Sequence, residues 1–203
     1  MKGKIGTVLL CLGLVGVIGG AMLLYNALKD NVETEQLAVE ENTDKNEDAN
    51  PDSDSKAESS QNELTKAYDF TVYDENGNAY KLSDFEGKPV VLNFWASWCN
   101  PCKSEMPDFE EAYGEYGENI HFLMVNMTDG YQESMESAKK LLTETGYTFP
   151  VYYDTALEAA KAYRVYSIPA TYFIDKDGYI TAYAQGALDK ETLEKGIGFI
   201  YSK

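Results

Sequence analysis

Hydrophobic and polar positions divide the chain into three zones. Residues 5–28 form a mostly apolar run without charged side chains, residues 30–65 are polar and acidic, and residues 66–203 alternate between short apolar runs and mixed stretches. The first run is long enough to cross a bilayer as a helix at about 1.5 Å per residue. The second zone has too few large apolar side chains to form a core, so we expect a disordered acidic linker there. The third zone has the size of one folded domain.

Short apolar runs that end at turn residues predict the strands of this domain. The expected strands cover residues 70–73, 79–82, 89–95, 121–126, 171–174 and 179–183, with a short extended piece at 149–153. The pairs Asn76-Gly77 and Asp177-Gly178 are typical of tight turns between neighbouring strands. The domain is therefore expected to begin with a hairpin.

Stretches with helical spacing predict helices at residues 101–116, 132–145, 155–163 and 188–201. Pro107 lies inside the first and predicts a kink. Gly146 is the expected end of the second, and Asp189 is the expected N-cap of the last. Strands and helices in this order predict an α/β fold in which helices cover both faces of a mixed sheet.

The apolar run at residues 5–28 follows Lys2 and Lys4, which places the N-terminus in the cytoplasm by the positive-inside rule. A cleaved signal peptide usually has an apolar core of about 7 to 15 residues and a small-residue cleavage site. The run here is longer and lacks such a site, so residues 1–29 are expected to be an uncleaved single-pass anchor in the cell membrane. The rest of the chain then lies outside the cytoplasm. Cys11 is interpreted as an apolar side chain and not as a lipid attachment site.

The charge of the chain narrows the classes of function. The formal net charge is −17 at pH 7. Nucleic-acid binding needs a basic surface, and so does docking on anionic lipid head groups. We therefore expect neither a nucleic-acid partner nor head-group binding.

Cys99 and Cys102 are the chemical centre of the sequence. They follow the apolar strand at residues 89–95 and open the helix predicted at residues 101–116. Residues i and i+3 in a first helical turn have Cα atoms about 5 to 5.5 Å apart, which a disulfide tolerates. The free N–H groups and the positive end of the helix dipole favour a thiolate on Cys99. The pair is therefore interpreted as a reagent for thiol–disulfide exchange.

Two structural interpretations compete with this redox role. A zinc site needs four ligands, but the chain has only Cys11 and His121 besides the pair and the carboxylates. A passive disulfide across three residues closes too small a loop to stabilise the fold much. No metal is expected, and His121 is assigned to packing or to the surface.

Four segments carry a resemblance to a known family: residues 82–88, residues 93–102 with Glu105 and Pro107, residues 167–175 and residues 186–188. The chain resembles the membrane-anchored TlpA/ResA-type thiol–disulfide oxidoreductases of the thioredoxin-like superfamily. The resemblance implies a thioredoxin-like sheet flanked by helices, preceded by one transmembrane helix and the acidic linker. It also implies that the redox-active disulfide Cys99–Cys102 is the only cofactor.

The resemblance implies roles for residues around the pair. Cys99 would be the exposed nucleophile and Cys102 the buried resolving thiol. Pro169 would be a cis-proline that faces the disulfide, and Ile168 would offer its backbone to an extended substrate segment. The substrate-binding residues would be Trp98, Pro101, Ile168 and Pro169. Trp98 would shield one side of the pair, with a core indole as the alternative.

Glu105 and Asn93 are the polar candidates beside the pair. Thioredoxin has a buried aspartate where this chain has Asn93, and an amide cannot accept the proton of Cys102. Glu105 follows Cys102 by three residues on the same helix face, and in ResA-type members a glutamate there tunes the pair. A partly desolvated carboxyl would have a raised pKa and could transfer a proton. The alternative for Glu105 is a solvated surface acid.

The expected activity is reduction of disulfides in exported partner proteins, such as apocytochrome c, by a tethered dithiol. The resemblance implies a CcdA/DsbD-type membrane electron donor. A disulfide oxidase remains open, because small changes between the cysteines move the potential by tens of millivolts. A peroxiredoxin-class thiol peroxidase is a second alternative, although Ser97 stands where its threonine is usual. A non-catalytic surface binding domain that uses the 16 tyrosines is the third.

Overall fold

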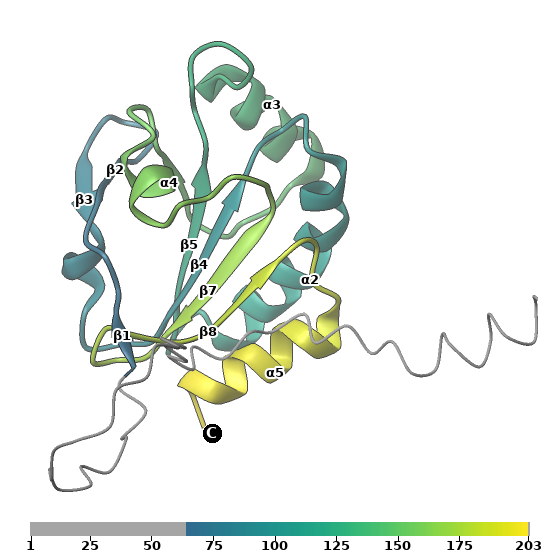
Figure 1. Cartoon of the computed structure of the whole chain (residues 1–203). Coiled ribbons are helices and arrows are strands. Elements are labelled where there is room, and N and C mark those ends of the chain that lie inside the picture. Colours follow the sequence, from purple (N-terminus) through teal and green to yellow (C-terminus); the bar gives the residue numbers. More distant parts are fainter. Residues whose placement is uncertain (1–63, 203) are drawn as a thin grey trace, which may run out of the picture. The chain divides into compact units, whose positions relative to one another are not determined.

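The structure is a computed structural model and describes residues 64–202 (Figure 1). These residues form a mixed sheet of eight strands in the order β1-β8-β7-β4-β5-β6-β2-β3. The membrane helix expected at residues 5–28 and the linker before residue 64 lie outside the described residues. Among residues 64–202, no helix combines the length and the apolar composition of a membrane span.

The sheet and its helices follow the predicted order. The strands are β1 (Thr65–Lys66), β2 (Thr71–Tyr73), β3 (Ala79–Lys81), β4 (Val90–Trp95), β5 (His121–Asn126), β6 (Val151–Tyr153), β7 (Ala170–Ile174) and β8 (Tyr179–Gln185). The helices are α2 (Asn100–Tyr116), α3 (Met135–Thr145), α4 (Glu158–Ala162) and α5 (Lys190–Ile200), with a 3₁₀ turn η1 (Leu82–Phe85). The predicted α/β fold with a mixed sheet and an N-terminal hairpin of β2 and β3 is confirmed.

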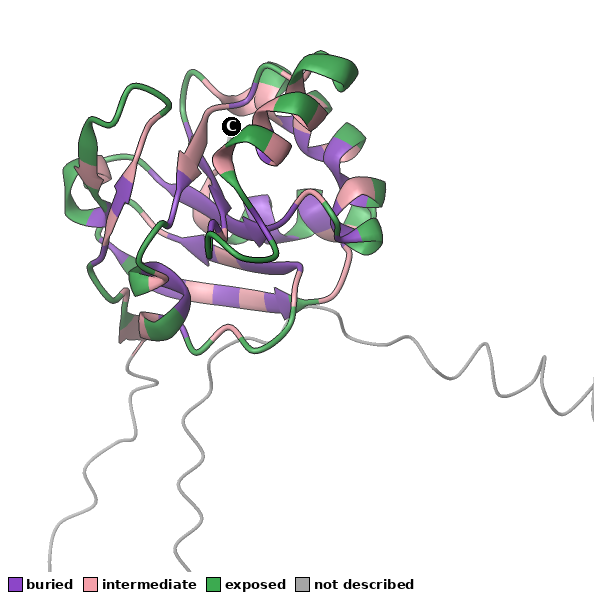
Figure 2. Ribbon diagram, turned by 90° about the horizontal axis from the view of Figure 1, so that it is seen from above, coloured by how far each residue is buried: buried purple, intermediate pink, exposed green. Residues whose placement is uncertain are grey.

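Strand β4 is the centre of the fold. It pairs in parallel with β5 and antiparallel with β7, and all its residues are buried. Val91 and Trp95 pack with buried residues of α2, α3 and α5, whereas Leu92 and Phe94 pack with β2 and α4 on the other face. Figure 2 shows this buried layer between more exposed helices and loops. A strand that is buried at every position and apolar at all but one, Asn93, is typical of a sheet covered on both faces.

Two helices begin later than predicted, because side chains cap them. Helix α3 begins at Met135 and not at residue 132, since the hydroxyl of Ser134 accepts a hydrogen bond from the Ser137 N–H at 3.1 Å. Helix α4 begins at Glu158 and not at residue 155. The carboxylate of Asp154 accepts hydrogen bonds from the N–H groups of Glu158 and Ala160. Both errors concern helix boundaries, which local hydrogen bonds decide.

The other helix ends lie within two residues of the predicted ends. Asp189 accepts a hydrogen bond from the Thr192 N–H at 2.9 Å and caps α5. Gly146 ends α3 in a left-handed conformation with φ 75°, which glycine adopts without strain. Helix α2 runs without a break past Pro107, where the sequence predicted a kink.

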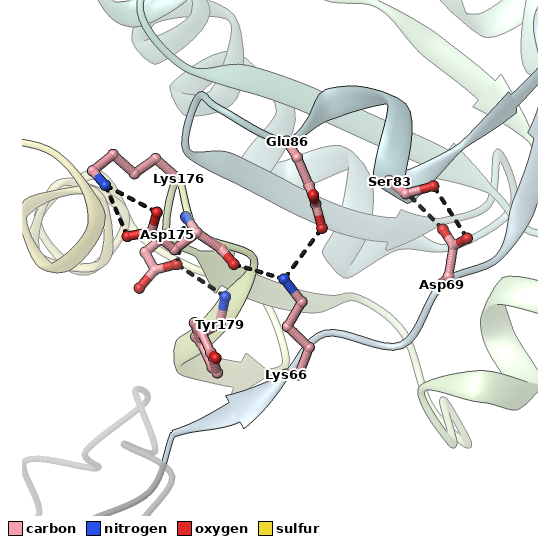
Figure 3. A network of polar contacts seen from close by, with 8 residues as sticks. Lys66, Asp69, Ser83, Glu86, Asp175, Lys176 and Tyr179 are labelled. Atoms are coloured by element: carbon pink, nitrogen blue, oxygen red, sulfur yellow. Dashed lines mark hydrogen bonds and ion pairs between the residues drawn. The ribbon is translucent and has the colours of Figure 1, made fainter.

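Strand β1 was not predicted, and it ties the start of the domain to the edge of the sheet. It pairs with Tyr179 and Ile180 at the start of β8. The ammonium of Lys66 donates hydrogen bonds to Glu86 and to the carbonyl of Asp177, as Figure 3 shows beside the neighbouring Asp69–Ser83 contacts. The start of β8 lies far from Trp95. Ile180 pairs with Ile174 of β7, and Ile174 pairs with Val90, which is at the opposite end of β4 from Trp95.

Two glycines of α5 give a matched test of its packing. A Cβ atom at Gly196 would overlap the ring of Phe173, whereas Gly198 has open space around it. We expect Gly196→Ala to lower the free energy of unfolding by about 1 to 3 kcal/mol through overpacking. Gly198→Ala is expected to leave stability unchanged or raise it by up to about 1 kcal/mol, because alanine favours the helix. Urea denaturation measures both. Equal effects of the two variants would contradict close packing of α5 against β7.

Candidate active site

Cys99 and Cys102 form a disulfide where β4 leads into α2. The S–S distance is 2.05 Å and the two Cα atoms are 5.3 Å apart, within the range that the spacing predicted. Cys99 is the N-cap of α2, and its sulfur accepts a hydrogen bond from the Cys102 N–H at 3.2 Å. A thiolate at this position would accept the same bond and would lie at the positive end of the helix dipole.

The accessibility of Cys99 differs from the expectation. The resemblance implied an exposed nucleophile, but in this oxidised state Cys99 is 3% exposed and Cys102 is fully buried. The sulfur of Cys99 is bonded to its partner and lies 3.7 Å from the carbonyl oxygen of Ile168. A disulfide sulfur carries no proton, so this approach is a contact, and only the reduced thiol could donate there.

The cis-proline segment faces the pair. The bond between Ile168 and Pro169 is cis, as the resemblance implied. The carbonyl of Pro169 accepts a hydrogen bond from the Gly186 N–H at 2.8 Å, and Ala170 pairs with Phe94 of β4. The fold thus places the backbone carbonyl of Ile168 beside Cys99, although the two segments are 69 residues apart.

Trp98 and Pro101 lie on the surface around the disulfide. Trp98 is 47% exposed, so the alternative of a core indole is wrong; Trp95 is the fully buried tryptophan. Trp98 lines a groove together with Met127, Leu157 and Ile168. Pro101 is exposed in the first turn of α2. Backbone N–H groups there have no partner within the helix, so the lack of an N–H in proline costs no hydrogen bond.

Glu105 is buried in α2, one turn after Cys102, and is 1% exposed. Its Oε1 accepts a hydrogen bond from Nδ2 of Asn93 at 2.9 Å, and its Oε2 accepts one from the N–H of Leu188 at 2.9 Å. Burial raises the pKa of Glu105 to about 7, although the hydrogen bonds from Leu188 and Asn93 oppose the shift. The alternative of a solvated surface acid is therefore wrong.

Asn93 connects Glu105 to the strand that follows Pro169. Its Nδ2 also donates to the hydroxyl of Thr171 at 3.0 Å, while its Oδ1 is buried without a hydrogen-bond partner. Sequence reasoning missed Thr171 and Leu188. Thr171 could have been found as a polar residue within an apolar strand. The contribution of Leu188 is a backbone N–H, which no side-chain pattern reveals.

A zinc site would need further ligands beside Cys99 and Cys102, and the part of the chain that the structure describes does not provide them. Between residues 64 and 202, no three His, Cys, Asp or Glu side chains lie close enough together to hold a metal ion. His121 lies at the start of β5, where its ring packs edge-on against Phe85. His121 pairs with Val90 at the start of β4, whereas the disulfide follows the end of β4, so the two are far apart in the sheet.

Comparison with known proteins agrees with this geometry. The AhpC/TSA family model matches residues 64–183. The thiol-disulfide oxidoreductase ResA of Geobacillus kaustophilus (strain HTA426) is 38% identical over 130 residues, which cover 64% of this chain and 72% of that protein. The thioredoxin-like protein YneN of Bacillus subtilis (strain 168) is 35% identical over 141 residues, 70% of this chain and 82% of that protein.

Solved structures share the fold as well. The pneumococcal exposed lipoprotein thioredoxin Etrx1 from Streptococcus pneumoniae strain TIGR4 superposes with a TM-score of 0.57 and is 32% identical. The match covers 64% of this chain and 98% of that one. The fold, the disulfide at the start of α2 and these relatives lead to one conclusion: the chain belongs to the AhpC/TSA family and is a thioredoxin-like thiol–disulfide oxidoreductase of the ResA type.

Proposed function

We propose that this oxidoreductase is tethered to the cell membrane and reduces disulfides in partner proteins outside the cytoplasm. The observation that supports this most is the position of the Cys99–Cys102 disulfide. It lies at a helix N-terminus, beside the backbone of Ile168 and close to an exposed groove. A protein segment extended along Ile168 would bring its own disulfide within reach of Cys99.

The reaction begins with the reduced pair. The Cys99 thiolate attacks one sulfur of the target disulfide, forms a mixed disulfide and releases the other target sulfur as a thiolate, which takes up a proton. Cys102 then loses its proton, and its thiolate attacks the Cys99 sulfur. This step closes the Cys99–Cys102 disulfide and releases the second target thiolate. The second target thiolate also takes up a proton. Two electrons pass from the enzyme to the target, whose two protons come from the solvent, while the enzyme loses one proton from Cys99 before the attack and one from Cys102 during resolution.

Glu105 is the proposed acceptor of the Cys102 proton. It lies one turn further along α2, and a pKa near 7 lets it both take up and release a proton near neutral pH. Cys102 is fully buried and needs such a base, because water does not reach its sulfur. Asn93 and the Leu188 N–H hold the carboxyl in place.

The membrane tether rests on the sequence of residues 5–28 and on the lysines before it. The similar protein Etrx1 is an exposed lipoprotein, which supports a surface location for a chain of this kind. Outside the cytoplasm the pair has no bulk supply of thiols. We therefore propose a CcdA/DsbD-type membrane protein as electron donor, and apocytochrome c or other exported proteins as substrates.

Trapping tests this function directly. In the full-length chain, Cys102→Ser is expected to stop the reaction after its first step and to retain partner proteins on Cys99 as mixed disulfides. These adducts should disappear on treatment with a thiol and should be absent from the Cys99→Ser, Cys102→Ser double variant. Adducts that form equally in the double variant, or adducts with cytoplasmic proteins alone, would contradict the proposal.

The direction of exchange is measured by equilibrium with glutathione. A reductase is expected to have a potential well below about −120 mV, the value of a strong oxidant. A potential near that value would favour the oxidase. Consumption of peroxide that depends on Cys99 and outpaces insulin reduction would favour the peroxidase.

A further inference from the structure

We infer that Glu133 is a positioning residue that fixes the segment in front of Cys99 and sets the reduction potential of the pair. Glu133 follows β5 in the loop before α3 and is 2% exposed. Its Oε2 accepts a hydrogen bond from the hydroxyl of Ser97 at 2.7 Å, and its Oε1 accepts one from the Ser97 N–H at 3.1 Å. Glu133 therefore binds both hydrogen-bond donors of a residue that lies two positions before Cys99.

The loop that carries Glu133 is itself held in place. One oxygen of Asp129 accepts hydrogen bonds from the N–H groups of Tyr131, Gln132 and Glu133 at 2.8 to 2.9 Å. Gly130 adopts φ 74° and donates its N–H to the Glu133 carbonyl. A turn with this many internal hydrogen bonds presents the buried carboxylate in one orientation.

Asn126 fixes the carboxylate from a second side. Its Nδ2 donates to Oε1 of Glu133 at 2.8 Å, and its Oδ1 accepts from the hydroxyl of Thr128 at 2.7 Å. Asn126 is the last residue of β5 and pairs with Trp95 of β4. The Glu133 contact thus links the ends of the two central strands to the segment that leads into the disulfide.

This segment determines where the Cys99 sulfur lies. The Cys99 N–H donates to the Ala96 carbonyl at 3.1 Å, which closes a tight turn around Ser97 and Trp98. If Ser97 moved, the turn would shift the Cys99 sulfur relative to the Cys102 N–H and the Ile168 carbonyl. The Cys102 N–H would stabilise the Cys99 thiolate, and the backbone of Ile168 would hold the substrate segment. Glu133 does not touch the reacting sulfurs: it acts through its contacts with Ser97 and through its charge.

The charge of Glu133 determines the direction in which this residue shifts the equilibrium between the disulfide and the dithiol. Its donors Ser97 and Asn126 are neutral, and none of the ion pairs within residues 64–202 includes Glu133. An uncompensated negative charge near Cys99 disfavours the thiolate, whereas the disulfide is uncharged and is affected less. Glu133 therefore favours the oxidised pair, which makes the reduced enzyme a stronger reductant.

Two substitutions separate the charge from the contact. Glu133→Gln keeps the shape: the glutamine oxygen can accept from Asn126 and from the Ser97 N–H, while its amide can donate to the Ser97 hydroxyl. We expect it to shift the equilibrium with glutathione toward the dithiol by about threefold to tenfold, which is about 14 to 30 mV. Ser97→Ala removes one contact and keeps the charge. It is expected to lower kcat/KM for insulin reduction several-fold with a smaller shift in the equilibrium.

Glu110 is a matched control. It accepts hydrogen bonds from the N–H and the hydroxyl of Thr148, the same pattern that Glu133 makes with Ser97, but it joins α2 to the segment before β6. Glu110→Gln should alter stability without moving the equilibrium with glutathione. A shift of equal size in Glu110→Gln, or no shift in Glu133→Gln, would overturn the inference.

The inference rests on thiol–disulfide exchange by Cys99 and Cys102, but not on its direction or its partners. The equilibrium constant is measured on the purified full-length chain in detergent. A wild-type chain that equilibrates normally while Glu133→Gln changes nothing refutes the role of Glu133 alone. A Cys102→Ser chain that traps no exported partner refutes the proposed function, whereas the shift in potential can still be measured in chains that keep both cysteines.

Discussion

A chain with Cys99→Ser is expected to reduce insulin disulfides at least about a thousandfold more slowly than the wild-type chain, because a hydroxyl cannot replace a thiolate as the attacking group. The sulfur of Cys99 accepts the Cys102 N–H and lies beside the Ile168 carbonyl, where a substrate segment would bind. Cys102 is fully buried and cannot take over the attack. The rate is measured from the turbidity of reduced insulin with dithiothreitol as donor.

The resolving cysteine provides the control for this experiment. Cys102→Ser should also stop multiple turnover, but it should retain the first step and yield about one mixed disulfide per chain. Different outcomes at positions 99 and 102 would therefore assign attack and resolution separately. If the double variant with both serines kept reducing insulin, the activity would not depend on the pair, and the mechanism would be wrong.

The central strands were predictable because their environment is uniform. Both faces of β4 are buried and mostly apolar, and β5 beside it is apolar from Phe122 to Val125, so short apolar runs were sufficient to identify both strands. Asp189 and Gly146 marked helix ends for local chemical reasons. The mixed sheet followed from the order of these elements.

What the sequence did not reveal depends on contacts between distant segments. β1 has only two residues and exists because it pairs with β8, more than a hundred residues later. Helix α4 is shortened by Asp154, whose side chain takes the N–H groups that would otherwise start the helix earlier. Strand pairing and side-chain capping of this kind leave little trace in hydrophobic periodicity.

The sequence predicted some residues of the active site and missed others for the same reason. The spacing of Cys99 and Cys102 indicated the chemistry, whereas the role of Ile168 came only from resemblance to a family. Glu133 was missed because the sequence predicted it in the first turn of the helix at residues 132–145, where a glutamate looks like a surface residue. Its burial depends on Ser97 and Asn126, which lie on other segments.

Glu105→Gln is expected to remove a pH dependence of stability. The folded chain holds the proton of Glu105 with a pKa of about 7, compared with the ordinary value of 4.5. A carboxyl with a raised pKa contributes most to stability below its unfolded pKa and loses this contribution as pH rises through its folded pKa. Between pH 4.5 and 7 the wild-type chain should therefore lose on the order of 3 kcal/mol at this group.

The glutamine variant carries no charge in this range, so its stability curve should be flatter by that amount. Urea denaturation at several pH values measures the difference between the two chains, in which the other titrating groups cancel. Parallel curves for wild type and Glu105→Gln would show that the buried carboxyl does not titrate as described.

The network around Glu105 explains why glutamine can be accommodated. The Oδ1 atom of Asn93 is buried without a partner, and a rotation of this amide would present it to the new NH₂ group and to the Thr171 hydroxyl. The same rotation would let protonated Glu105 donate its proton to Oδ1. Nδ2 of Asn93 would then be buried without a partner in place of Oδ1, so the number of unpartnered buried atoms would stay the same.

Stability and activity should then change in opposite directions. At pH 8, Glu105→Gln is expected to be more stable by about 1 to 3 kcal/mol, because a buried charge is removed. Resolution by Cys102 should become about a hundredfold slower, because no base takes its proton. A purely structural residue would lower both quantities or neither, so a stabilised variant with slow resolution is the result that only a proton-accepting Glu105 predicts.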